Sequence, residues 1–178
     1  VSTFMTYGMI LGVRPASPFK RLEDLISFAK ANPGKLTFYS VGAGSAHHLI
    51  GEWFNALTGA ELVHVPYKGS PAAFPDFLAG RIDVMIDTMT FGLTQVTGGK
   101  ARALAITSRE PMTELPGVPT MSTVLPELEY ESWLGLLAPR GMPPKLLERV
   151  NREVREIAAL PDVAARIRDL GAIPRTSS

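Results

Sequence analysis

The chain has 178 residues, of which 46% are hydrophobic and 20% charged, and its formal net charge is +1. This size suits one domain with a core, or one lobe of a protein together with part of another. The basic residues are scattered along the chain, which argues against nucleic acid as the partner. The absence of cysteine excludes disulfides and cysteine metal sites, and no apolar run approaches the roughly 18 to 20 residues of a membrane-spanning helix.

The first predicted element is a strand over residues 1–13. No initiating Met and no signal-peptide pattern precede it, so we expect this sequence to be a piece of a longer protein. Pro15 and Pro18 then mark a loop. Apolar residues at helical spacing predict a helix over 22–31, which ends at the Asn-Pro-Gly of 32–34.

The segment 35–50 contains a strand, a glycine-serine turn and a helix in direct succession. Apolar and aromatic residues over 36–41 predict the strand, and Gly42 and Gly44 allow the backbone to bend. Ser45 stands where the N-cap of the helix belongs. Such a helix directs unpaired backbone N–H groups and the positive end of its dipole beyond the strand. The sequence therefore predicts an anion site for a carboxylate or a phosphate.

Short apolar strands and helices continue to alternate after this turn. We expect strands over 62–65, 82–86 and 101–107, each preceded by a helix, with these helices ending at Gly59, Gly80 and Gly98. Strands of this length separated by helices predict right-handed βαβ units and a parallel sheet. The predicted fold class is therefore α/β.

The sequence changes character beyond Ser108. A proline-rich loop region is followed by a strand over 130–138, a long amphipathic helix over 144–158 and a shorter helix from Pro161. These last helices need a partner surface. The first strand and the strand around Trp133 are the expected crossings between lobes, so the chain should belong to a two-lobed protein.

A nucleotide site at the glycine-serine turn is poorly supported. Gly42-x-Gly44 resembles part of a dinucleotide fingerprint, but His47 takes the third glycine position, and Lys68 stands where an acidic ribose ligand is expected. A phosphate P-loop is also missing, because no Gly-Lys-Ser/Thr follows the turn.

Hydrolytic and metal chemistry are equally weak interpretations. Ser45 lies too near its neighbouring histidines at a helix start for a nucleophile and base, and no G-x-S-x-G elbow is present. His47, His48 and His64 lack zinc-site spacing and carboxylate companions, so we expect them to pack or to support other residues. The simplest alternative for the turn itself is a structural βα loop.

Two further loops are predicted to meet the glycine-serine turn. Tyr67 and Lys68 follow the strand over 62–65, and Asp87 ends the next strand. The carboxyl ends of parallel strands share one edge of a sheet, where ligands bind. Taken singly, Lys68 is a solvated charge and Asp87 an N-cap, but their convergence favours a binding site.

An ordered series of motifs resembles the Bug family, the extracytoplasmic solute receptors of tripartite tricarboxylate transporters. The resemblance covers nearly the entire chain and rests on the segments 33–36, 42–49 (Gly-x-Gly-Ser-x-His-His-Leu), 63–70 (Val-His-Val-Pro-Tyr-Lys-Gly-Ser), 83–87, 101–108, 115–120 and 132–139. It implies a type 2 periplasmic-binding fold, in which two α/β lobes close on a small organic carboxylate without catalysis, metal or cofactor. It also implies a periplasmic location and membrane permease subunits as partners.

The resemblance assigns residues 8–132 to the second lobe, and residues 1–7 and 134–178 to remnants of the first lobe. The first-lobe carboxylate loop has no counterpart here, so the chain resembles a receptor truncated at its N-terminus. The expected ligand-binding residues are Ser40, Gly42, Ala43, Gly44, Ser45, Ala46, His47, Tyr67, Lys68 and Asp87. We also expect a homo-oligomer or lobe exchange through the exposed C-terminal helices. A sensor module for a signalling partner and, less favoured, an enzyme with a nucleotide cofactor remain the alternatives.

Overall fold

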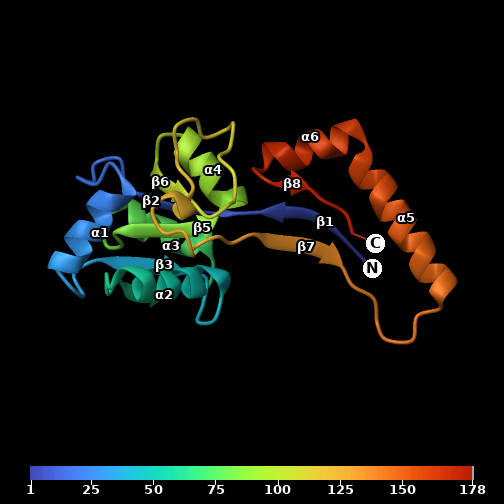
Figure 1. Cartoon of the computed structure of the whole chain (residues 1–178), viewed down its shortest axis with the longest axis horizontal. Helices are drawn as coiled ribbons and strands as arrows, with labels where there is room; N and C mark the ends of the chain where they lie inside the picture. Colours follow the sequence, from blue (N-terminus) through green and yellow to red (C-terminus); the bar gives the residue numbers. More distant parts are fainter. Residues whose placement is uncertain (178) are drawn as a thin grey trace.

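The computed structural model describes residues 1–177 and contains two separate sheets (Figure 1). In chain order the elements are β1 (Ser2–Tyr7), β2 (Met9–Val13), α1 (Leu22–Ala31), β3 (Thr37–Ser40), α2 (Ala46–Thr58), β4 (Val63–Pro66), α3 (Ser70–Leu78), β5 (Val84–Thr88), α4 (Met89–Thr97), β6 (Arg102–Ile106), the 3₁₀ turn η1 (Met121–Thr123), β7 (Ser132–Leu136), α5 (Pro144–Ala159), α6 (Pro161–Asp169) and β8 (Ile173–Pro174). The α/β class predicted from the sequence is confirmed.

The larger sheet has the strand order β4-β3-β5-β2-β6, and we call it, with α1 to α4, the large unit. β3 runs parallel to both β4 and β5. β2, however, is antiparallel to its two neighbours β5 and β6. The predicted parallel sheet therefore contains one antiparallel strand, β2, which lies between β5 and β6.

The direction of β2 follows from how the chain enters the large unit. The strand expected over residues 1–13 is in fact two strands in two different sheets, separated by Gly8. A Cβ at Gly8 would lie 3.1 Å from the backbone N of Ser108, so the chain passes close to a neighbouring segment at this point. Because β2 enters at the edge where β3 and β5 end, it runs opposite to them.

Helices cover both faces of the large sheet. Successive side chains of a strand point to opposite faces, so the central strands feed two apolar clusters. One cluster joins α1 and α2 to the sheet and includes Leu25, Phe38 and Phe54. The other joins α3 and α4 to the opposite face and includes Tyr39 and Phe77. The large unit is thus a three-layer α/β/α arrangement.

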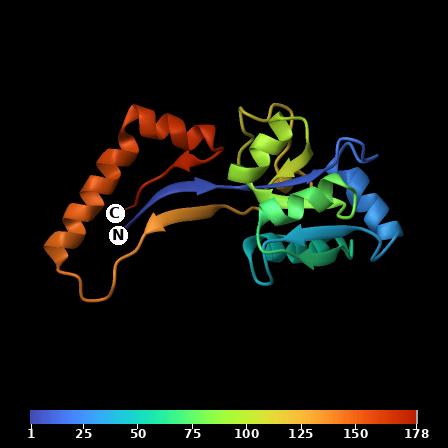
Figure 2. The same ribbon diagram turned by 180° about the vertical axis from the view of Figure 1, so that it is seen from behind.

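The smaller sheet, with the order β7-β1-β8, is antiparallel and forms with α5 and α6 what we call the small unit. The two helices curve around one side of this sheet and leave much of it open, as both views show (Figures 1 and 2). Apolar side chains remain exposed there, among them Trp133 at 55% and Leu137 at 75%. The chain ends lie together, since Ser2 Oγ donates to the Ser177 carbonyl oxygen at 2.8 Å.

Candidate functional site

The glycine-serine loop connects the end of β3 to the start of α2, as the sequence predicted. Gly42 has a φ angle of 133° and Gly44 one of 78°, a region of backbone conformation that favours glycine. No heavy atom lies within 4 Å of the position that a Cβ would take at either residue. Backbone conformation, and not crowding, is therefore what requires glycine in this loop.

Ser45 is the N-cap of α2, as predicted. Its hydroxyl accepts a hydrogen bond from the backbone N–H of His48 at 3.4 Å and donates to the carbonyl oxygen of Gly42 at 2.7 Å. At the start of the loop, the N–H of Gly42 donates to Ser40 Oγ at 3.1 Å. These bonds hold the loop as a compact turn against the first turn of the helix.

Several backbone N–H groups of this loop remain open, and three of them lie beyond its first glycine. Within residues 1–177, the N–H groups of Ala43, Ala46 and His47 have no protein acceptor. Ala46 and His47 open the first turn of α2, where the helix dipole is positive. Open donors at a helix N-terminus can replace the water around a carboxylate or phosphate group. The loop can therefore bind an anion without a metal or a charged side chain.

Asp87 lies beneath this loop at the end of β5, and its side chain is fully buried. Its oxygens accept hydrogen bonds from four residues, which come from β3, α2, α3 and β5 itself. The contacts are Tyr39 OH at 2.6 Å, His47 Nε2 at 3.1 Å, Ser70 Oγ at 2.9 Å, and Thr88 N and Oγ1 at 2.7 and 3.3 Å. Burial, and next the negative charge of Asp87, raise the pKa of Tyr39. The Tyr39 hydroxyl thus keeps its proton and donates a hydrogen bond to Asp87.

The other two histidines, His48 and His64, support the outer side of the loop. The N–H of Gly44 donates to Nδ1 of His48 at 3.0 Å. The ring of His48 stacks on that of His64 with centroids 3.9 Å apart, and His64 Nε2 lies 2.6 Å from Ser40 Oγ. These two residues match the supporting role that the sequence suggested for the histidines.

The acid–base behaviour of His64 provides a test of this arrangement. Burial, and then the neighbouring His48, lower the pKa of His64 from its ordinary value of 6.5, while Glu52 acts in the opposite direction. We expect His64 to titrate below pH 6.5 in NMR spectra, and His48→Ala to raise the midpoint. Glu52→Gln should lower it further. A midpoint that does not rise in His48→Ala would contradict the stacked arrangement.

The same shift has a defined effect on stability. Because the folded state disfavours protonated His64, the unfolded chain binds more protons around pH 6.5 than the folded chain does. The contribution of this group to stability is complete well above pH 6.5. It declines as the pH falls from 6.5 toward the lower pKa of the folded state.

Two other predicted residues, Tyr67 and Lys68, are less closely associated with the glycine-serine loop. Tyr67 donates its hydroxyl to Asp76 of α3 at 2.7 Å, and Lys68 is exposed at the surface. The backbone N–H of Tyr67 also donates to the carbonyl oxygen of Ser40, where the loop begins, at 2.9 Å. Lys68 shares no hydrogen bond with the glycine-serine loop within the described residues. Sequence reasoning missed the roles of Tyr39 and Ser70, which it treated as part of a strand and of a helix start. Only the position of Ser70 after Gly69, at the same sheet edge, could have indicated its contribution.

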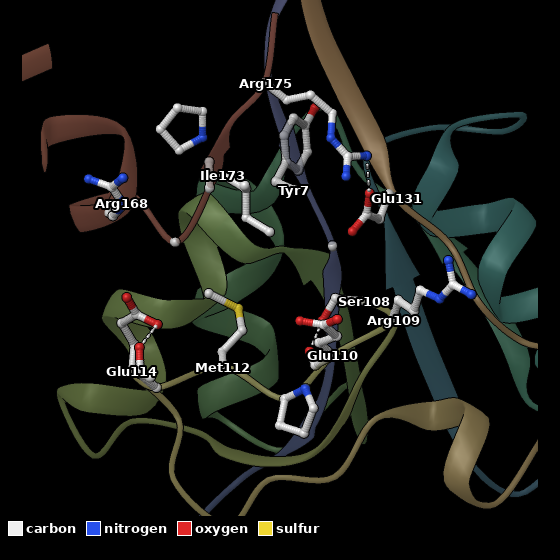
Figure 3. A pocket seen from close by; sticks show the side chains of 16 residues that line it. Tyr7, Ser108, Arg109, Glu110, Met112, Glu114, Glu131, Arg168, Ile173 and Arg175 are labelled. Carbon is white, nitrogen blue, oxygen red and sulfur yellow. Dashed lines mark hydrogen bonds and ion pairs between the residues drawn. The ribbon is translucent and has the colours of Figure 1, made fainter. Parts of the chain in front are cut away.

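A pocket of about 470 Å³ lies elsewhere, between the large and small units (Figure 3). It is lined by the 108–114 segment and by residues around β8, and the Arg175–Glu131 ion pair at 3.4 Å lies within it. No residue of the glycine-serine loop contributes to it. We base the candidate site on the donors of the loop, because a carboxylate site needs convergent N–H groups more than it needs enclosure by one lobe.

Within residues 1–177, no group of three or more histidine, cysteine or acidic side chains is placed to hold a metal ion. In the same part of the chain, none of the helices combines the length and apolar character needed to span a bilayer.

Comparison with known proteins gives a consistent result. The sequence profile described as "Tripartite tricarboxylate transporter family receptor" matches residues 1–177. A protein described as "UPF0065 protein in tcbD-tcbE intergenic region" from Pseudomonas sp. (strain P51) is 39% identical, with 93% of this chain and 50% of that protein covered. "Protein BugT" from Bordetella pertussis is 35% identical, with 93% and 51% covered. This chain therefore spans about half the length of these curated relatives.

Solved structures match equally well. The structure described as "R. palustris Rpa4515 with adipate" has a TM-score of 0.90 and 31% identity, with 98% of this chain and 58% of that chain covered. "MatC (Rpa3494) from Rhodopseudomonas palustris with bound malate" has a TM-score of 0.87 and 28% identity, with 98% and 60% covered. "Structure of periplasmic binding protein BugD" has a TM-score of 0.86 and 30% identity, with 98% and 58% covered.

Proposed function

Because the chain belongs to the family of tripartite tricarboxylate transporter receptors, we propose that it captures a small organic carboxylate through the glycine-serine loop of its large unit. Receptors of this family bind solutes and are not enzymes. The related structures carry adipate and malate, so a dicarboxylate is the ligand class that we propose here. We further propose a periplasmic location and delivery of the ligand to the membrane permease subunits of the transporter.

The observation that carries this proposal is the set of open donors at the N-terminus of α2. The N–H groups of Ala43, Ala46 and His47 lie within one short turn, and none has a protein acceptor among residues 1–177. A carboxylate has two oxygens that need donors once water is removed. Ser40, Gly42, Gly44 and Ser45 then hold the shape of the loop, and we keep them in the proposed site.

The fold is the type 2 periplasmic-binding fold, represented by one near-complete lobe and part of another. We propose that residues 8–132 form the second lobe, and that 1–7 and 134–178 belong to the first. The separation of the two sheets at Gly8 and ahead of β7 supports this division. In a receptor of full family length, the glycine-serine loop would then supply one side of the ligand site.

Carboxylate binding can be tested by calorimetry with adipate, malate and a tricarboxylate such as citrate. Ser45→Ala removes the N-cap of α2, at a cost of about 1 kcal/mol in stability. The loop also loses the hydroxyl that holds its turn, so we expect carboxylate binding to weaken roughly five-fold. Ser27→Ala, at an exposed position of α1, is the matched control and should bind as the unchanged protein does. Absence of heat and of competition with every organic acid tested would refute the proposed function.

We also propose that the small unit mediates self-association or lobe exchange. Its exposed apolar side chains include Trp133, Leu137, Leu146 and Ile157, and apolar faces of this kind mark interaction surfaces. Light scattering of the chain should give a mass above that of a monomer, rising with concentration. Leu137→Glu should shift the mass toward the monomer. A compact monomer at all concentrations would contradict this proposal.

A further inference from the structure

Asp87 is a carboxylate buried directly beneath a site that we propose for another carboxylate. Its side chain is 0% exposed, so it cannot contact a ligand as the sequence-based prediction supposed unless the loop above it opens. Its oxygens are also already occupied by hydroxyl, imidazole and backbone donors. Burial of an ionised carboxylate is costly unless donors surround it in this way.

His47 connects this buried carboxylate to the ligand site within one residue. Its backbone N–H is among the open donors of the loop, and its ring Nε2 lies 3.1 Å from Asp87 Oδ1. The other ring nitrogen, Nδ1, is buried and has no hydrogen-bond partner in residues 1–177. Asp87 is thus the polar partner that fixes the orientation of this ring. Because a buried N–H without an acceptor is unfavourable, the arrangement places the ring proton on Nε2, facing Asp87.

The same carboxylate also joins the starts of two other helices. Ser70, the first residue of α3, donates to Asp87 Oδ1, as does the backbone N–H of Thr88, the N-cap of α4. Tyr39 reaches Oδ2 from β3. One buried charge therefore fixes α2, α3 and α4 relative to the end of the sheet.

We infer that Asp87 is a positioning residue, which holds the ring of His47 and thereby fixes the open N–H groups of α2 for the ligand carboxylate. This inference rests on the proposed function for its meaning in binding, but the positioning itself is a property of the free protein. Asp87 acts on the ligand through His47, without touching it. The donors around Asp87 stabilise its charge in the buried position.

The test uses Asp87→Asn, which keeps the shape of the side chain and removes its charge. The matched control is Asp83→Asn, because Asp83 precedes the same strand and binds Thr37 N and Oγ1 at 2.9 and 3.0 Å at the opposite end of the sheet. Long-range ¹H–¹⁵N spectra report which nitrogen of His47 carries the proton. Amide chemical shifts report the surroundings of the N–H groups of Ala43, Ala46 and His47, and adipate titration reports affinity.

We expect Asp87→Asn to free the His47 ring from the Nε2–H tautomer, to shift the three amide signals and to weaken adipate binding at least ten-fold. Asp83→Asn should lower stability without these changes. If Asp87→Asn does not fold, Tyr39→Phe removes one donor from Asp87 and should produce the same changes to a smaller degree. Unchanged His47 and amide signals, or equal changes in the Asp83→Asn control, would overturn the inference.

Failure of the proposed function gives a different pattern. If the unchanged protein shows no response to adipate while its His47 and amide signals still depend on Asp87, the positioning role holds and the carboxylate proposal loses its support. If the unchanged protein binds adipate and Asp87→Asn binds it equally well with the same amide signals, only the positioning role fails.

Discussion

Gly51→Ala is expected to destabilise the large unit by about 3 kcal/mol, at the upper end of the cost of overpacking a core. A Cβ at Gly51 in α2 would lie 2.2 Å from Cε2 of Phe38 and 2.3 Å from its Cζ. The ring of Phe38 is fully buried in the core between α2 and the sheet, so it has no free space into which it can move. Denaturant unfolding of the two proteins measures the difference.

Gly92→Ala provides the control for this prediction, because Gly92 also lies in a helix packed on the sheet. Its added Cβ would lie 3.0 Å from Cδ1 of Ile10, the end of a flexible side chain. Alanine also favours the helix by about 1 kcal/mol over glycine. We therefore expect a change of less than about 1 kcal/mol. Equal losses at Gly51 and Gly92 would show that the contact with Phe38 is not the cause.

Gly42→Ala is expected to abolish measurable carboxylate binding, or to weaken it more than ten-fold. A φ angle of 133° is strongly unfavourable for alanine, at a cost of about 1–3 kcal/mol, so the loop should move to another conformation. The arrangement of the open N–H groups of Ala43, Ala46 and His47 would then change. Calorimetry with adipate and malate measures the loss.

Gly34→Ala separates loop geometry from general destabilisation. Gly34 has a φ angle of 70° and no heavy atom near its potential Cβ, but it lies in the turn between α1 and β3 at the other end of the sheet. The Gly34→Ala protein should lose about 1–2 kcal/mol of stability and retain its affinity for the carboxylate. If the Gly42→Ala protein binds the carboxylate as well as the Gly34→Ala protein does, the assignment of the glycine-serine loop as the carboxylate site is refuted.

Local signals in the sequence predicted the elements and the anion loop well. The strand, the two glycines, the N-cap at Ser45 and the end of α2 at Gly59 were predicted and are confirmed. Such features depend on residues within a few positions of one another, because capping and φ preference are local interactions. The ordered motifs also identified the family correctly.

Interactions between distant segments decided the strand directions, the strand pairing and the contacts of Asp87. Only the tertiary structure shows that β2 is antiparallel to its neighbours and that the short strand β8 pairs with β1. The sequence by itself determined the family, the α/β class and the loop that opens α2. The tertiary structure alone placed Tyr39, His47 and Ser70 around Asp87, residues 17 to 48 positions away in the chain. Hydrogen bonds to a buried charge depend on which strands become neighbours, and pairing across such separations leaves no local pattern in the sequence.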